Sequence, residues 1–296
     1  MRVPDRAIAE LVRAPAALSV PGDALAGAAA ADRLGVRAAG LSAASVCLYL
    51  AGMAANDWAD RDLDAATRPE RPVPSGRVAP VTALRIAAAL SAAGLTLAAA
   101  VGGRRALAVA VPLTGGAWLY DLRLKDTAAG PAAMAACRGL DVLLGASLGG
   151  ASLGGARPGK QRRAAAIAAA VAVHTGTVTL LSRREVTGGG RVLPGVTLAA
   201  TAALGAVTAV APGRTRLSTG LTAWYAASYG LAQARALARP DAGRMRAATA
   251  TGITVLPALQ AGLIARSGTR AAAIAGLTVA AAAPAGRALA KKMPPT

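Results

Sequence analysis

The stretch NDWADRDLDAATRPERPVPSGRV, Asn56 to Val78, gathers acidic and basic side chains between two strongly apolar segments. If the preceding helix continues into this stretch, Asp57, Asp60 and Asp64 have the offsets i, i+3 and i+7 and share one face, whereas Asp62 points away. Three carboxylates on one face repel one another unless a cation lies among them. The aspartates therefore predict either a cation site or a solvated helix end beside an apolar segment.

The second half of the stretch favours the cation site. It carries three arginines, at 68, 71 and 77, and prolines at 69, 72 and 74 that stiffen the loop ahead of a Ser75-Gly76 turn. Carboxylate and amide oxygens suit Mg²⁺, which binds phosphate oxygens beside one or two carboxylates. Guanidinium groups add charge-assisted hydrogen bonds to phosphate. The combination predicts a diphosphate ligand.

The composition predicts an all-α, polytopic membrane protein. The 296 residues are 54% hydrophobic and 16% charged, with a mean hydropathy of +0.46. A helix needs about 20 apolar residues to cross the bilayer. Apolar runs recur at about 15–33, 37–55, 79–101, 105–120, 130–153, 162–181, 192–211, 218–238, 248–266 and 269–289. We therefore expect nine or ten transmembrane helices, packed closely through their many alanines and glycines.

The charges predict orientation and do not indicate nucleic acid as a partner. The net charge is +19, but the basic residues are spread over short loops and form no continuous patch. Loops on the amino-terminal side of the membrane carry more Arg and Lys than the opposite loops, which predicts that this side is cytoplasmic. Most acidic residues fall on the same side. We expect the active face there, in contact with membrane lipids.

Two motifs resemble a known family. Asn56-Asp57-x-x-Asp60-x-x-x-Asp64, followed by Arg71-Pro72-x-Pro74-Ser75-Gly76, resembles the first signature of the UbiA superfamily of intramembrane prenyltransferases. YDLRLKD, Tyr120 to Asp126, resembles the tyrosine-to-lysine element that the family places after its fourth span. The resemblance is strongest over 12–266 within a single domain of 1–296, and 267–296 reads as an extra helix with a basic tail. It implies a ring of about nine helices around a central cavity.

The resemblance also implies roles for individual residues. The catalytic residues would be Asp57, Asp60 and Asp64. Mg²⁺ would be held by Asn56, Asp57, Asp60 and Asp64, and Glu185, outside the first motif, is added as a candidate metal ligand. Arg71 and Lys125 would bind the phosphate oxygens, and Arg61 stands where many family members have an arginine. With Arg68 of the same loop, Arg138 and Arg184, the predicted diphosphate-binding residues are Arg61, Arg68, Arg71, Lys125, Arg138 and Arg184.

The loop LSRREVTGGGRV, Leu181 to Val192, departs from the family pattern. The family places its second aspartate-rich motif there, but Glu185 is the only acid in this loop. Three alternatives follow: Glu185 alone anchors a second metal ion, Arg183 and Arg184 replace the charge of that metal, or the chemistry has drifted. The segment "SRRE" is also similar to a branch that accompanies bacterial Ebo-type gene clusters, the EboC-like proteins.

Arg138 and Asp141 form a further candidate pair inside an apolar segment. Their spacing of three lets them face one another on one side of a helix. Ionisable residues at membrane depth usually pair and face an interior cavity, which makes them functional candidates. The alternative is a structural ion pair near the membrane interface.

These observations predict Mg²⁺-dependent transfer of a prenyl group from a prenyl diphosphate to a lipophilic or aromatic acceptor. Two alternatives stay open. A phosphatidyltransferase also uses spaced aspartates at a membrane surface, but its Asp-Gly and Ala-Arg pairs are missing from the 56–78 stretch. A protein that binds or transports an isoprenoid diphosphate or lipid without reaction is consistent with the reduced 181–192 loop.

Overall fold

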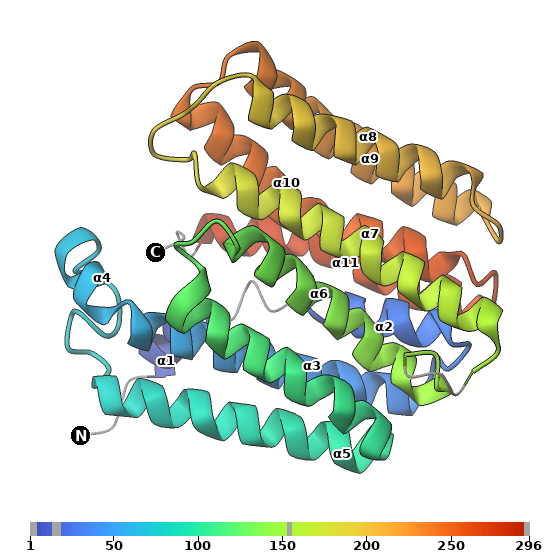
Figure 1. Ribbon diagram of the computed structural model, residues 1–296, viewed down its shortest axis with the longest axis horizontal. Helices are drawn as coiled ribbons and strands as arrows, with labels where there is room; N and C mark the ends of the chain where they lie inside the picture. The colour runs from blue at the N-terminus through green and yellow to red at the C-terminus, as the bar shows by residue number, and fades with distance from the viewer. Residues whose placement is uncertain (1–4, 14–18, 153–155, 293–296) are drawn as a thin grey trace.

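The described residues of the protein, in a computed structural model, are 5–13, 19–152 and 156–292, and they fold into helices joined by short loops (Figure 1). In chain order the elements are α1 (Asp5–Leu11), α2 (Pro21–Ala30), α3 (Val36–Ala59), α4 (Arg61–Thr67), α5 (Pro80–Leu119), the π-helical turn η2 (Tyr120–Leu124), α6 (Gly130–Ala146), the 3₁₀ turn η3 (Ser147–Gly149), α7 (Pro158–Ser182), α8 (Val192–Val210), α9 (Arg216–Ala238), α10 (Ala242–Ala265) and α11 (Arg270–Lys292).

Six of the described helical segments are long and apolar enough to cross a membrane: 36–59, 80–124, 130–149, 158–182, 192–210 and 242–265. The all-helical, multi-pass prediction is therefore confirmed, but the count of nine or ten spans is not. The first expected span, 15–33, contains only the ten-residue α2, and 14–18 lie outside the described residues. The extra helix expected after 267 is present as α11.

Helix α5 is two helices joined by a sharp turn. Gly103 interrupts it with φ +66° and ψ −158°, a conformation that residues with a Cβ rarely adopt. In Figure 1 the chain runs out along α5, turns and returns beside α3. The two apolar runs expected at 79–101 and 105–120 are the two arms of this hairpin. Because the second arm leads directly into η2, the turn brings η2 back beside the end of α3.

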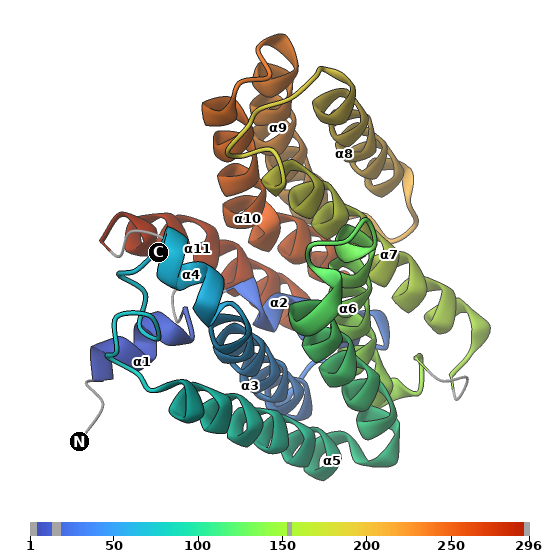
Figure 2. The ribbon, with the colours of Figure 1, turned by 60° about the vertical axis from the view of Figure 1, so that its left-hand side comes forward.

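The helices are arranged from α5 at one edge of the molecule to α8 and α9 at the opposite edge (Figures 1 and 2). Helix α3 packs along α5, α6 packs on α7, and α10 contacts α7, α9 and α11. The short α2 is inserted among α3, α6, α7 and α10. It is almost entirely buried, so it joins the half of the molecule built on α3 and α5 to the half built on α7 and α10.

Helices α2 and α6 cross at a contact that only glycine permits. A Cβ added to Gly27 would lie 1.8 Å from the carbonyl oxygen of Val142, and a Cβ added to Gly145 would lie 1.8 Å from the carbonyl oxygen of Ala24. The backbones therefore touch directly, as small residues allow in membrane proteins. This crossing fixes where α6 presents its polar side chains.

We expect Gly145→Ala to destabilise the protein by about 1–3 kcal/mol, because the new methyl group must push two backbones apart. The matched control is Gly220→Ala on α9, where an added Cβ meets nothing within 4 Å. Detergent-solubilised protein would be unfolded by heat or by SDS titration. Equal stability of the two variants would contradict the close crossing.

Candidate functional site

The site begins where α3 ends. The shared face of Asp57, Asp60 and Asp64 assumed one continuous helix through Asp64, but the structure has a break there: α3 ends at Ala59, Asp60 caps it, and α4 begins at Arg61. Asp57 and Asp64 are each only 3% exposed, whereas Asp62 is exposed as expected. The break turns the helix without exposing Asp57 or Asp64, so both carboxylates stay inside the protein.

Arg71 joins the two buried aspartates. Its Nη1 lies 2.6 Å from Oδ2 of Asp64 and 3.6 Å from Oδ1 of Asp57, and the side chain is itself buried. The following turn holds Arg71 in place: Ser75 donates to the Arg71 carbonyl from its amide and from its hydroxyl, at 3.0 and 2.6 Å. Gly76, at φ +73°, completes the turn. The Pro-x-Pro-Ser-Gly pattern thus aims a guanidinium at the aspartates.

Asn56 links two further carboxylates. Its Nδ2 donates to Oδ2 of Asp60 at 3.2 Å and to Oδ1 of Asp121 at 3.3 Å. Lys125 forms an ion pair with Asp60. Asp121, on η2, is 5% exposed. It is a site residue that the sequence prediction missed, although it lies four residues before Lys125 and therefore on the same helical face.

The amino-terminal segment closes the cluster with another missed residue, Arg13. Its Nη2 lies 3.3 Å from Oδ1 of Asn56 and 3.4 Å from Oδ1 of Asp57. Arg13 has φ +47°, in the left-handed region that few residues with a Cβ occupy. Nearby, a hydrogen bond from Arg77 lowers the pKa of Glu10 on α1. Nothing in the pattern around Arg13 indicates these contacts, because Asp57 lies 44 residues away.

The other predicted diphosphate ligands do not touch these carboxylates. Arg61 donates to the Trp58 carbonyl, stacks on the Trp58 ring and pairs with the exposed Asp62. Arg68 and Arg184 are exposed. Their predicted contacts with diphosphate stay predictions.

In the 181–192 loop, Arg183 makes the connection to the site. Its Nη2 donates to the carbonyl of Lys125 at 2.7 Å and to the carbonyl of Thr127. The sequence analysis names Arg183 and Arg184 together as a possible replacement for the metal's charge, and only Arg184 among the predicted diphosphate-binding residues. Glu185 is partly exposed, and its carbonyl accepts a hydrogen bond from Arg246. Arg183 therefore holds the loop against the segment after η2. The role of Glu185 as a metal ligand stays a prediction.

The expected pairing of Arg138 with Asp141 is wrong. Nε of Arg138 lies 2.9 Å from Oδ2 of Asp23 on α2, and Oδ2 of Asp141 accepts a hydrogen bond of 2.6 Å from Ser45 on α3. The spacing of three permitted a contact along α6, but the close crossing with α2 supplies a buried carboxylate to Arg138. Each residue of the expected pair is thus held by a different neighbouring helix.

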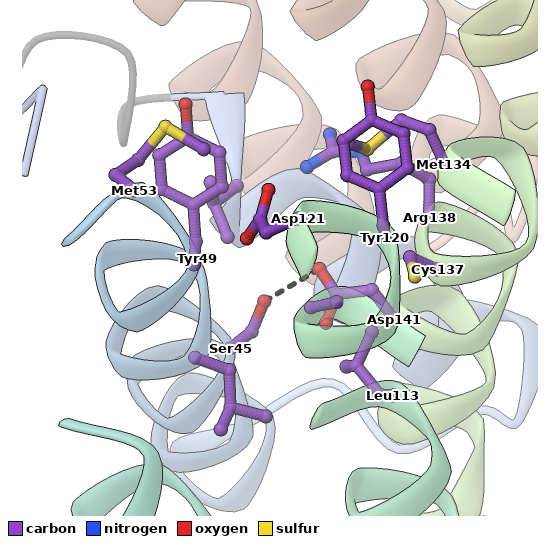
Figure 3. Close-up of a pocket in the computed structure, with 14 residues that line it drawn as sticks. Ser45, Tyr49, Met53, Leu113, Tyr120, Asp121, Met134, Cys137, Arg138 and Asp141 are labelled. Atoms are coloured by element: carbon purple, nitrogen blue, oxygen red, sulfur yellow. Dashed lines mark hydrogen bonds between the residues drawn. The ribbon is translucent and has the colours of Figure 1, made fainter. Parts of the chain in front are cut away.

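A cavity of about 100 Å³ lies between α3, α5, η2 and α6. Its walls are mainly apolar, and Leu113, Met53 and Met134 are among the residues that line it (Figure 3). The ionisable residues that line it include Asp121, Arg138 and Asp141. Because Asp121 also accepts from Asn56, the cavity begins directly beside the carboxylate cluster.

The chemistry of the cluster fits Mg²⁺. Asn56, Asp57, Asp60, Asp64 and Asp121 supply carboxylate and amide oxygens, the hard ligands that Mg²⁺ prefers. Among the described side chains, however, no group of three or more acids, histidines or cysteines is gathered as a metal site. Arg13, Arg71 and Lys125 separate the carboxylates by pairing with them. The residue types therefore agree with Mg²⁺, while positive side chains balance the carboxylates here.

Comparison with known proteins identifies a family. The profile of the UbiA prenyltransferase family matches residues 20–241. The chain is 42% identical over 110 residues to the digeranylgeranylglyceryl phosphate synthase of Ignicoccus hospitalis, a match that covers 37% of this chain and 33% of that relative. The chain thus spans about a third of the length of this curated relative.

Solved structures show the same fold. The apo structure of a UbiA homologue from Aeropyrum pernix K1 superposes with a TM-score of 0.69 and 24% identity, covering 84% of this chain and 96% of that chain. A UbiA homologue from Archaeoglobus fulgidus, bound to GPP and Mg²⁺, gives a TM-score of 0.56 at 15% identity, covering 89% and 100%.

We expect Arg71→Ala to destabilise the protein by about 3–5 kcal/mol, since it removes the ion-pair partner of the buried Asp64. The control is Arg68→Ala in the same loop, whose exposed side chain predicts a change within about 0.5 kcal/mol. SDS titration of the purified protein measures both. An effect of Arg71→Ala no larger than that of the control would contradict a stabilising role for the buried ion pairs of Arg71 with Asp57 and Asp64.

Proposed function

The chain belongs to the UbiA prenyltransferase family, and from that premise we propose that it transfers a prenyl group from a prenyl diphosphate to a lipophilic or aromatic acceptor within the membrane. The observation that supports this most is the cluster at the end of α3, where oxygen ligands and cationic side chains meet beside an apolar cavity. A diphosphate needs both kinds of group, and a prenyl chain needs an apolar surface.

Within this proposal, Asn56, Asp57, Asp60 and Asp64 would hold Mg²⁺, which would supply positive charge to the diphosphate. Arg71 and Lys125 bind its phosphate oxygens, exchanging their carboxylate partners for phosphate when the substrate enters. Glu185, Arg61 and the exposed Arg68 and Arg184 remain further candidates. Arg183 keeps the Lys125 segment in position through its hydrogen bonds to the carbonyls of Lys125 and Thr127.

The reaction that these residues support is ionisation followed by capture. The bond between the first prenyl carbon and its oxygen breaks, and the electron pair leaves with the diphosphate. Bound Mg²⁺ would stabilise the negative charge that grows there, and Arg71 and Lys125 add electrostatic stabilisation. The apolar cavity walls exclude water, which would otherwise capture the allylic cation in place of the acceptor.

The membrane setting and the acceptor class belong to the same proposal. The excess of basic residues on the loops of the amino-terminal side supports a cytoplasmic active face of a cell-membrane protein. The name of the Ignicoccus hospitalis relative supports an acceptor that is itself a lipid. The GPP and Mg²⁺ bound to the Archaeoglobus fulgidus homologue support an isoprenoid diphosphate as donor.

We expect Asp60→Asn to lower prenyl transfer about 10²-fold or more, because it removes a charge that faces the diphosphate site. Purified protein would be incubated with radiolabelled farnesyl or geranylgeranyl diphosphate, a panel of acceptors and either Mg²⁺ or a chelator. The matched control is Asp62→Asn, on the exposed side of α4, which should react at the unaltered rate.

Three outcomes of this assay are informative. Transfer that requires Mg²⁺ and is lost only in Asp60→Asn supports the enzyme. Tight diphosphate binding with no transfer to any acceptor favours the non-catalytic binder. Equal activity of the two variants would remove Asp60 from the site.

Glu185→Gln tests the reduced second loop in the same assay. If Glu185 anchors a second metal ion, the variant should need about tenfold more Mg²⁺ or a larger excess for half-maximal transfer, because even the outer-shell partners of metal ligands change metal affinity about 10–100-fold. Unchanged Mg²⁺ dependence would show that Glu185 does not anchor a metal ion. The loop would then act on the site only through Arg183 and its hydrogen bonds.

A further inference from the structure

We propose that Asp121 is a metal ligand, and that Asp60 and Asp121 together form the part of the cluster that binds the divalent cation. The inference rests on the proposed metal-dependent prenyl transfer and deepens it, since Asp121 is not among the metal ligands that the sequence predicts. It supplies an acid that does not come from the 181–192 loop, where Glu185 is the only one.

Asp60 and Asp121 are joined by one amide group. Nδ2 of Asn56 donates to Oδ2 of Asp60 at 3.2 Å and to Oδ1 of Asp121 at 3.3 Å, so the two carboxylates are neighbours across a single nitrogen atom. The π-helical turn η2 brings Asp121 there, and its i→i+5 bond runs from the amide of Lys125 to the carbonyl of Tyr120 at 2.9 Å. Turns of this kind are frequent at functional sites.

One carboxylate oxygen of Asp121 is free to bind a ligand. Asp121 is 5% exposed, and among the described residues the only hydrogen bond to its side chain is the one from Asn56 to Oδ1. Oδ2 lies against α3, where a Cβ added to Gly52 would be 4.0 Å away. Both Gly52 and Asp121 line the cavity (Figure 3). Protein atoms do not seal Oδ2, in contrast to Oδ1 of Asp141, so an ion in the cavity can reach it.

The cluster is short of one positive charge at this pair of carboxylates. Its described members are four carboxylates and the three cationic side chains that pair with them: Asp57, Asp60, Asp64, Asp121, Arg13, Arg71 and Lys125. The two arginines pair with Asp57 and Asp64, whereas Asp60 and Asp121 have one lysine between them. The excess negative charge therefore falls on Asp60 and Asp121.

A divalent cation suits both this charge and these oxygens. It would change the net charge of the cluster from negative to positive, which favours binding of a diphosphate. Mg²⁺ usually takes one or two protein carboxylates and completes its shell with water and phosphate oxygens. Two carboxylates are therefore sufficient, which agrees with the finding that no three acids, histidines or cysteines gather among the described side chains. Asn56 would position the two carboxylates, since its Oδ1 faces Arg13.

The first test measures Mn²⁺ binding without substrate, because Mn²⁺ suits the same oxygen ligands as Mg²⁺. Purified protein is titrated with Mn²⁺, and the free ion is followed by its electron paramagnetic resonance signal. We expect Asp121→Asn to weaken binding about tenfold or more, since even outer-shell partners of metal ligands have effects of this size. The control, Asp126→Asn, removes the same charge from an exposed position and should bind Mn²⁺ as the unaltered protein does. Equal binding by Asp121→Asn, or no binding by the unaltered protein, would overturn the proposal.

Thermal unfolding in the same detergent shows whether the variants are folded. Asp121→Asn removes a buried charge that has no full partner, so in chelator it should unfold at the temperature of the unaltered protein or above it. Mn²⁺ should then raise the unfolding temperature of the unaltered protein and of Asp126→Asn, because a ligand stabilises the state that binds it. The same rise in Asp121→Asn would contradict the metal site.

The variant Asp121→Cys separates direct ligation from a long-range effect of charge. It is made in a background in which the free cysteines, Cys47 and Cys137, are replaced by alanine. A thiolate is a soft ligand, so Asp121→Cys should bind Cd²⁺ more tightly and Mn²⁺ more weakly than this background. Asp126→Cys should gain no comparable affinity for Cd²⁺. Equal gains at the two positions, or no gain at 121, would show that Asp121 does not touch the ion.

Two further results separate this inference from the proposed function. If Mn²⁺ binds as expected but no prenyl group is transferred from any donor, the metal site stands and the proposed transfer is wrong. If Asp60→Asn or Glu185→Gln weakens Mn²⁺ binding and Asp121→Asn does not, Asp121 is not a ligand and the proposed function is unaffected.

Discussion

The site depends on the balance between buried carboxylates and the cations that pair with them at the end of α3. Asp57 and Asp64 are buried deeply enough that their charge requires a partner, and Arg71 supplies it through a turn stiffened by proline. Lys125, which follows η2 at the end of the α5 hairpin, forms an ion pair with Asp60. If these cations turned to a phosphate, the buried carboxylates would need another cation in their place, which the proposed Mg²⁺ would supply. The cluster thus combines the oxygen ligands and cations on which the proposed diphosphate site rests.

The same constraint explains the positions of several otherwise unrelated segments. Gly103 turns α5 back on itself, so that η2 arrives beside α3 and Asp121 meets Asn56. The 181–192 loop reaches the same region from α7 through Arg183. Parts of the chain that are far apart in sequence therefore meet at one cluster. Changes in any of them should alter the geometry of this cluster.

The α2–α6 crossing gives the molecule its second polar region. Because Gly27 and Gly145 let the two backbones touch, Asp23 reaches Arg138 and turns that guanidinium along the cavity wall. The cavity then has the carboxylate cluster at one end and Arg138 with Asp141 on a neighbouring wall. Polar side chains therefore reach an otherwise apolar cavity from two places, η2 and α6.

The sequence alone determined the membrane-protein class, the family resemblance and the aspartates and loop arginine of the first motif, because hydropathy and local spacing encode them. It also placed Lys125 in the site through its own motif. Tertiary structure decided the rest: Arg13 and Asp121 join the cluster, Arg183 connects the 181–192 loop to the segment after η2, and Arg138 pairs with Asp23. Local spacing shows which side chains share a helical face. Which distant helix lies opposite that face is set by backbone packing, here by glycines at 27, 103 and 145, and no local pattern reports it.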